Sequence, residues 1–169
     1  MSFLLQLFKD ICLFKKGPED TPSSINLLIF LFITNLFSEI ILGLSVYSLS
    51  FIMSAILSII SVVVLVLYTV FWLYVFKLKS RILQTITAFL GISLFMNVCF
   101  LLPILTLWKL NIISETTFGF STIIFLMWSL SIYVHIYKNA LSISLIQSIA
   151  LTITSFILIN TISINITGA

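Results

Sequence analysis

Charged residues are scarce in this sequence. Asp, Glu, Lys and Arg make up 8% of its 169 residues, whereas a soluble domain carries about 25%. Apolar residues make up 61%, and the mean hydropathy is +1.30. One buried core cannot absorb that much apolar surface, so lipid must solvate most of it. We therefore predict an all-α, polytopic membrane protein that contacts the lipid bilayer directly.

Cysteine and histidine are also scarce, which argues against a disulfide framework and a metal centre. The two cysteines are Cys12 and Cys99. We expect them to lie far apart and to act as small apolar residues. The single histidine, His135, has no Cys, Asp or Glu at ligand spacing, so it is a weak metal candidate. We expect no metal, no cofactor and no catalytic residue.

Five apolar runs are long enough to cross a bilayer as helices. They cover residues 25–46, 50–76, 82–107, 118–137 and 141–164, within a predicted bundle over 25–169. Residues 47–49 are predicted to be a tight turn, and 17–24 a Gly/Pro turn before the first span. In residues 1–16 the polar side chains share one arc of a helical wheel. This pattern predicts an amphipathic helix in the membrane interface, acting as an anchor or as a lipid sensor.

The basic residues predict how the chain is threaded. In a five-span arrangement all but one fall on the same side, and only Lys109 falls on the other. The first group is Lys9, Lys15, Lys16, Lys77, Lys79, Arg81 and Lys138. Basic loops face the cytoplasm, so we expect a cytoplasmic N-terminus and a periplasmic C-terminus. The net charge of +3 is thus explained by topology, and no basic stripe with interleaved aromatic residues indicates nucleic-acid binding.

A narrow polar stripe on the first span gives the first candidate site. Asn35, Ser38, Glu39 and Gly43 share one helical face, and Glu39 is the only carboxylate inside a predicted span. Such a stripe should face other helices. Asn97 of the third span is expected at a similar depth, so a direct Asn97–Glu39 hydrogen bond is predicted. The cluster Asn35, Glu39 and Asn97 is either a proton or cation site or a structural hydrogen-bonded group.

A second candidate site lies at the predicted cytoplasmic interface and comprises Arg81, Gln84, His135 and Lys138. The basic residues around Arg81 either contact anionic lipid headgroups or only fix the topology. Further along the third span, Pro103 lacks a backbone donor and crowds the carbonyl of Cys99. A kink is therefore expected there, as a gate or only as shape.

Three stretches resemble uncharacterised proteobacterial inner-membrane proteins near the Yip (Ypt-interacting protein) domain type. They are residues 17–22, residues 81–91, and residues 128–141 at the end of the fourth span. The sequence departs from that pattern at Val134, Lys138 and Asn139, where the family has Gly, Arg and His. The resemblance implies five helices and a cytoplasmic N-terminus. Eukaryotic relatives are linked to vesicle traffic and small GTPases, but bacteria lack that machinery, so little function carries over.

Three function classes follow. The first is a non-enzymatic protein of a bacterial inner membrane that organises, assembles or binds a partner, either another membrane protein or a second copy. The alternative is a small transporter or channel subunit that uses Glu39 and the polar residues near it. A membrane enzyme ranks last, because His135 and Lys138 have no carboxylate close in sequence.

Overall fold

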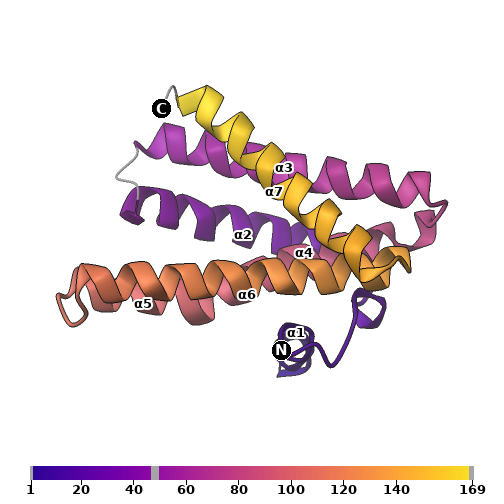
Figure 1. The fold of residues 1–169 in the computed structure, drawn as a ribbon, viewed down its shortest axis with the longest axis horizontal. Helices are drawn as coiled ribbons and strands as arrows, with labels where there is room; N and C mark the ends of the chain where they lie inside the picture. The colour runs from indigo at the N-terminus through magenta and orange to yellow at the C-terminus, as the bar shows by residue number, and fades with distance from the viewer. Residues whose placement is uncertain (1, 47–49, 168–169) are drawn as a thin grey trace.

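Five long apolar helices, preceded by a short N-terminal helix, form the fold (Figure 1). The computed structural model describes residues 2–46 and 50–167, and the turn predicted at 47–49 lies outside them. The helices are α1 (Ser2–Cys12), α2 (Ile25–Val46), α3 (Phe51–Val75), α4 (Ile82–Met96), α5 (Leu102–Lys109), α6 (Glu115–Leu141) and α7 (Leu145–Thr167). A π-helix, η3 (Asn97–Leu101), joins α4 to α5, so that these three elements make one span. The chain is a multi-pass membrane protein by helix length and hydropathy.

The first predicted span has the bounds of α2, the second and third end within two residues of the observed helices, and the last two differ by more. α6 begins three residues before the predicted start at 118, because Ser114 caps it by accepting a hydrogen bond from the Thr117 amide (3.2 Å). The same helix runs to Leu141 instead of 137. It ends where Ser142 adopts the left-handed conformation (φ 55°, ψ 42°). α7 therefore begins at Leu145, later than the predicted 141.

α4 lies at the centre of the bundle and packs against α1, α2, α3 and α6. Its residues from Thr85 to Ile92 are buried without interruption, which means that protein surrounds every side of the helix. Gly91 makes this possible on one side, since a Cβ there would overlap the ring of Phe8 from α1. α4 is thus the element around which the other helices are arranged.

The third span remains helical through Pro103 because a π-helix precedes the proline. Leu102 donates its backbone N–H to the carbonyl of Asn97, five residues earlier, and Pro103 then occupies the first turn of α5. A π-turn inserts one extra residue into the helix, so the carbonyls near Pro103 are rearranged and the helix continues. The irregularity that the structure shows near Pro103 is thus a π-helix between Asn97 and Leu101, and the kink of the helix axis stays a prediction.

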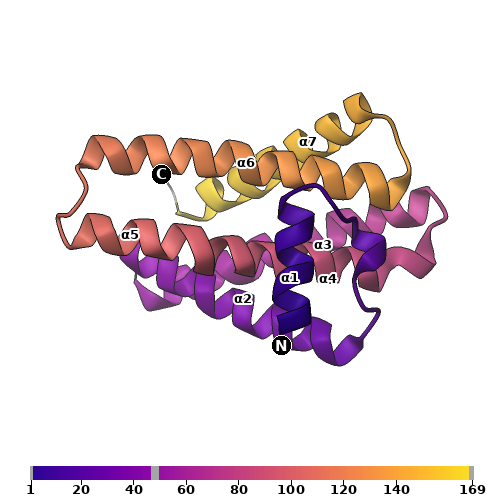
Figure 2. The same cartoon turned by 90° about the horizontal axis from the view of Figure 1, so that it is seen from below.

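α1 lies across the flank of the bundle, roughly perpendicular to the spans (Figure 2). Its residues Leu7, Phe8, Ile11 and Cys12 are buried against protein, with exposed fractions of 5% or less. The indole Nε1 of Trp128 on α6 donates to the Cys12 carbonyl (3.2 Å). The predicted amphipathic helix is confirmed as a helix, but α4 and α6 bury much of its apolar face. Its location at the membrane interface stays a prediction.

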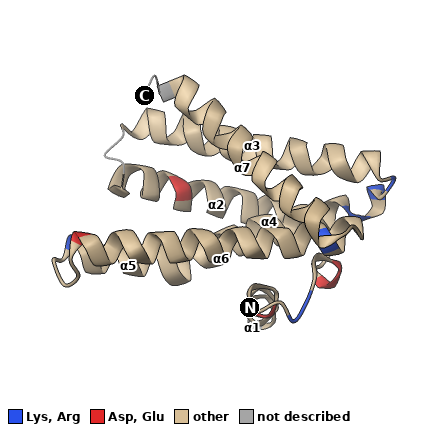
Figure 3. Cartoon of the chain, in the orientation of Figure 1, with Lys and Arg blue, Asp and Glu red and all other residues tan. Residues whose placement is uncertain are grey.

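The charged residues gather towards one end of the bundle (Figure 3). We call the end that holds the α3–α4 and α6–α7 connections the basic end; it carries Lys77, Lys79, Arg81 and Lys138. Lys109 and Glu115 lie at the opposite end, beside the α5–α6 connection. The predicted separation of charge is therefore present for the residues of these connections, whereas Lys9 belongs to α1 on the flank of the bundle and Lys15 and Lys16 follow it.

Candidate functional site

The carboxyl group of Glu39 is held between two helices. Its Oε2 accepts a hydrogen bond from the hydroxyl of Ser61 on α3 (2.9 Å). Its Oε1 lies 3.5 Å from the amide nitrogen of Asn35, one turn earlier on α2. Glu39 itself is only partly buried, whereas Asn35 is 1% exposed. The carboxyl is therefore tied to α2 and α3, although the residue as a whole is not fully buried.

A chain of hydrogen bonds links this carboxyl to the third span. The Asn97 amide donates to the Ser38 hydroxyl (3.3 Å), which donates to the backbone carbonyl of Asn35 (2.8 Å) and lies 3.5 Å from the side-chain Oδ1 of the same residue. Asn97 is the first residue of the π-helix. The predicted cluster of Asn35, Glu39 and Asn97 is thus connected, but the direct Asn97–Glu39 bond is wrong, because Ser38 and Asn35 lie between them.

Ser38 and Ser61 complete this network, although sequence reasoning did not place them in the site. Ser38 was visible on the polar stripe of α2. Ser61 belongs to a row of serines on α3, a pattern that indicates close helix packing. That packing is observed where a Cβ on Gly43 would meet the side chain of Ser54. The row of serines on α3 therefore has two roles. It brings α3 close to α2, and it supplies the Ser61 hydroxyl that donates a hydrogen bond to Glu39.

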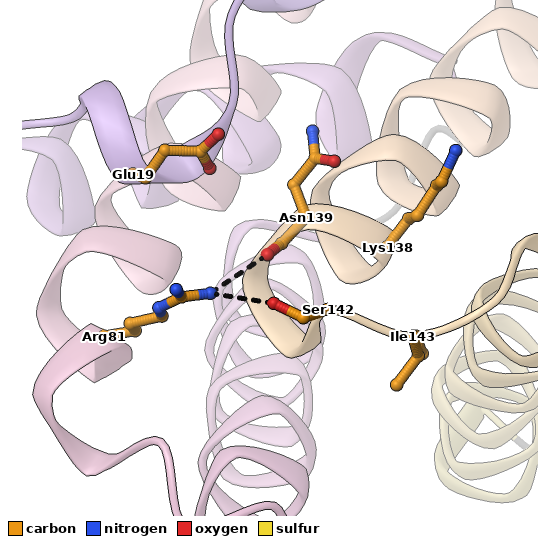
Figure 4. Close-up of a pocket in the computed structure, with 6 residues that line it drawn as sticks. All are labelled: Glu19, Arg81, Lys138, Asn139, Ser142 and Ile143. Carbon is orange, nitrogen blue, oxygen red and sulfur yellow. Dashed lines mark hydrogen bonds between the residues drawn. The ribbon is translucent and has the colours of Figure 1, made fainter.

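Two of the basic-end candidates, Arg81 and Lys138, line an open pocket of about 390 Å³ (Figure 4). Its walls are Glu19, Arg81, Lys138, Asn139, Ser142 and Ile143. One guanidinium nitrogen of Arg81, Nη1, donates to the carbonyls of Asn139 (3.2 Å) and Ala140 (3.1 Å) and to the Ser142 hydroxyl (3.3 Å). These bonds place a positive charge at the C-terminal end of α6, where the helix dipole favours it.

Gln84 fixes the opposite wall of the pocket. Its amide donates to the backbone carbonyl of Glu19 (3.4 Å). In addition, the buried hydroxyl of Thr21 lies 2.7 Å from the carbonyls of both Pro18 and Gln84. The turn that carries Glu19 is therefore fastened to the start of α4. Of the four predicted interface residues, Arg81 and Lys138 line the pocket and Gln84 holds its wall.

His135 lies outside this pocket, at the junction with α1. Its Nε2 is 2.9 Å from the carbonyl of Lys16, and its ring meets the edge of Phe14. The Asn139 amide nitrogen is 3.1 Å from the same ring nitrogen. His135 therefore fastens the segment after α1 to α6 and contacts the pocket only through Asn139.

Cys12 and Cys99 are closer together than predicted. Burial and, to a smaller extent, the Cys99 side chain together raise the pKa of the Cys12 thiol to about 12. The expected separation is wrong because α1 lies along the flank of the bundle and not at its end. Both thiols are free. Within residues 2–46 and 50–167, no group of His, Cys, Asp and Glu side chains could hold a metal ion.

Comparison with known proteins identifies no relative: no family model, curated protein or solved structure matches this chain.

Proposed function

We propose that this chain is a non-enzymatic membrane protein that acts by binding another membrane protein through the outer face of α7. The observation that carries the proposal is the exposed side chain of Asn160. This residue lies inside a membrane span, and the bond it makes within the described residues joins its amide to the carbonyl of Phe156 on its own helix (2.8 Å).

Asn160 is too deep to be a residue of the membrane interface. α7 has 23 residues and is therefore about 34 Å long, with Asn160 about 10 Å from its nearer end. A hydrocarbon core of about 30 Å leaves that position in lipid. Asparagine side chains in such places hydrogen-bond across helices, so the exposed carboxamide is best explained by a partner helix.

The neighbours of Asn160 form a seam suited to helix pairing. Ile146, Ala150, Ile153, Ile157 and Asn160 follow alternating spacings of four and three residues, and all of them are exposed. This is the spacing of a coiled-coil seam, in which one asparagine fixes the register and the partner. The seam is self-complementary. A second copy of the chain is therefore the first partner to test, and another membrane protein with a matching polar residue is the other.

The test is a pull-down of tagged protein from its native membrane in mild detergent, comparing Asn160→Leu with the unchanged chain. We expect the leucine variant to fold and to lose its stoichiometric partner. The matched control is Asn165→Leu. Asn165 is also exposed and also donates to a carbonyl four residues earlier (2.7 Å), but it lies about 140° away around the helix. Equal retention of the partner by both variants would contradict the proposal.

The rest of the proposal concerns location. The segregation of basic residues supports a bacterial inner membrane with the basic end in the cytoplasm, an N-terminus on that side and a C-terminus in the periplasm. A relationship to Yip-type proteins is compatible with this arrangement. Reporter fusions to the loop after Phe76 and to the C-terminus test the orientation, and an extracytoplasmic Lys77–Arg81 loop would overturn it.

A second candidate function is transport through an assembly of several copies, with Glu39 as a proton or cation site. The partial exposure of Glu39 and its link to the π-helix at Asn97 favour this alternative. Its test is flux into liposomes by Glu39→Gln, with Glu115→Gln, at the opposite end of the bundle from Arg81, as the control. Flux that survives Glu39→Gln would exclude this residue as the site.

A further inference from the structure

The pocket at the basic end combines both signs of charge on opposite walls. Arg81 and Lys138 contribute positive charge from the start of the third span and the end of α6, and Glu19 contributes a carboxylate from the turn before α2. In Figure 4 the Glu19 carboxylate faces Asn139 across the opening, and the Arg81 guanidinium points towards the end of α6. A ligand with an anionic and a cationic group matches this arrangement.

Some N–H donors of the Arg81 guanidinium make no hydrogen bond among the described residues. Its hydrogen bonds to Asn139, Ala140 and Ser142 all come from Nη1. A guanidinium has five N–H donors, so those on Nε and Nη2 are without an acceptor in the part of the chain that the structure describes. Because Nη1 fixes the group in place, the remaining donors form a rigid fork suited to a phosphate.

The backbone that carries the carboxylate of the other wall is also held in place. Gln84 bonds the backbone of Glu19, and Gly17 leaves the space that the Glu19 carboxylate occupies, since a Cβ at residue 17 would overlap it. Asp20 accepts a hydrogen bond from the Gly17 amide (3.1 Å) and so closes the same turn. The fold therefore keeps a negative charge beside two positive ones without an ion pair between them among the described residues.

The surroundings of the pocket indicate a lipid and not a soluble molecule. It lies at one end of the membrane spans, and Ile143 forms part of its lining. Leu145 and Ile146 at the start of α7 are 54% and 80% exposed, and Leu83 on α4 is 36% exposed. A headgroup in the pocket would therefore leave its acyl chains beside exposed apolar side chains.

We propose that this pocket binds a zwitterionic phospholipid headgroup, with its phosphate on Arg81 and Lys138 and its primary ammonium on Glu19. This inference is independent of partner binding through α7. A primary ammonium can donate hydrogen bonds to Glu19, whereas the quaternary ammonium of phosphatidylcholine cannot. Phosphatidylglycerol has the phosphate without any ammonium.

The experiment measures which lipid stays on the full chain. Protein released from nanodiscs with equal amounts of phosphatidylethanolamine, phosphatidylcholine and phosphatidylglycerol of identical acyl chains is examined by native mass spectrometry. We expect phosphatidylethanolamine to be retained in preference to both others. Glu19→Gln should lower its retention relative to phosphatidylglycerol about tenfold, the usual size of one charge-assisted hydrogen bond. Gly17→Ala should act in the same direction by displacing the carboxylate.

Lys138→Gln should weaken retention of phosphatidylethanolamine and phosphatidylglycerol alike and leave their ratio unchanged. Lys109→Gln, at the opposite end of the bundle, is the matched control and should change neither lipid. Arg81 is left intact because it also fastens the end of α6. The proposal is overturned if the lipid ratio is the same in Glu19→Gln as in the unchanged chain. It is equally overturned if water-soluble glycerophosphoethanolamine displaces the lipid at comparable concentration, since the ligand would then be a soluble phosphoester.

Discussion

The third span, of which α4 is the first part, and α7 are both apolar and long enough for a bilayer, yet α4 and α7 relate to the rest of the molecule in opposite ways. Every residue of α4 from Thr85 to Ile92 is buried, so protein surrounds the helix. On α7 the buried residues are Ser148, Thr152 and Ser155, which form one narrow strip. Hydropathy alone does not distinguish the two helices. What distinguishes them is whether polar and small residues face protein or point outward.

Because of this difference, the polar residues on the two helices support different inferences about a partner. Asn97, which follows α4 directly, donates to Ser38 inside the bundle, and its role is explained within one chain. Asn160 on α7 is exposed and bonds its own helix. A polar side chain that the fold already uses requires no partner, whereas one that faces lipid does. The functional proposal therefore rests on α7 and not on the more heavily buried α4.

The largest loss of stability should come from adding a side chain at Gly91 of α4, where the ring of Phe8 packs. We expect Gly91→Leu to expel the Phe8 ring and undock α1, lowering the free energy of unfolding by about 3 kcal/mol, the upper end of typical overpacking costs. Unfolding in a detergent titration measures it. Gly119 on α6 provides the control, because a Cβ there has nothing within 4 Å. Gly119→Leu should change stability by less than about 0.5 kcal/mol. Similar losses of stability in both variants would show that the packing of Phe8 does not require glycine at position 91.

A second prediction uses Cys12 to report whether α1 stays docked. Its thiol is 2% exposed and has a pKa raised from 9.0 to about 12, so below pH 9 it stays protonated. The thiolate is then about 1000-fold scarcer than in an unfolded chain. The higher nucleophilicity of the less acidic thiol recovers roughly 40–50% of that factor on a logarithmic scale, which leaves alkylation slower by ~30–60-fold.

The measurement is the rate of maleimide labelling at pH 8 in a Cys99→Ala background. Gly91→Leu should restore fast labelling, and Gly119→Leu should not. As the pH rises through about 12 the docked thiol ionises, so the difference from the unfolded chain should disappear there. Fast labelling of the unchanged chain at pH 8 would mean that α1 is not docked in solution.

Much of the architecture could be predicted from the sequence, because membrane spans leave long apolar runs and charged connections. The bounds of α2 agree with prediction residue for residue, and the i, i+4 spacing of Asn35 and Glu39 placed them on one face. The position of α1 could not be predicted in the same way. An amphipathic pattern shows that one face is to be buried, but it does not distinguish lipid from the surface of α4.

Two further features depend on tertiary geometry that no local pattern contains. The π-helix at Asn97–Leu101 adds a residue to its turn, and Asn97 at its start meets Ser38 instead of Glu39. The basic-end pocket needs Glu19, which sits in a turn far from Arg81 in sequence. Its place there depends on Gln84 and Thr21 bonding across the two segments. Sequence reasoning found Arg81 and Lys138 but had no reason to add Glu19.

A third prediction contrasts the two kinds of asparagine directly. Asn35 is 1% exposed and stands between Ser38 and Glu39. We expect Asn35→Leu to cost about 1–2 kcal/mol in the same detergent titration, because it leaves polar partners unsatisfied inside the bundle. Asn160→Leu should leave the stability of the single chain within about 0.5 kcal/mol of the original. If Asn160→Leu proves the more damaging of the two, its side chain is needed for folding and α7 loses its role as an interaction face.

The smallest effect should come from two buried threonines. Thr87 on α4 is 0% exposed and its hydroxyl has no hydrogen-bond partner among the described residues. Thr152 on α7 is 1% exposed and its hydroxyl donates to the Ser148 carbonyl (2.9 Å). Valine keeps the shape of threonine and removes the hydroxyl. We therefore expect Thr87→Val to raise the free energy of unfolding by up to about 1 kcal/mol, because an unpaired buried hydroxyl is costly.

Thr152→Val should lower the free energy of unfolding by about 0.5 kcal/mol, because a hydrogen bond present in the folded chain is lost. A loss of stability in both variants would mean that the Thr87 hydroxyl is satisfied in the bilayer, and that the interior of α4 is more polar than its close packing indicates.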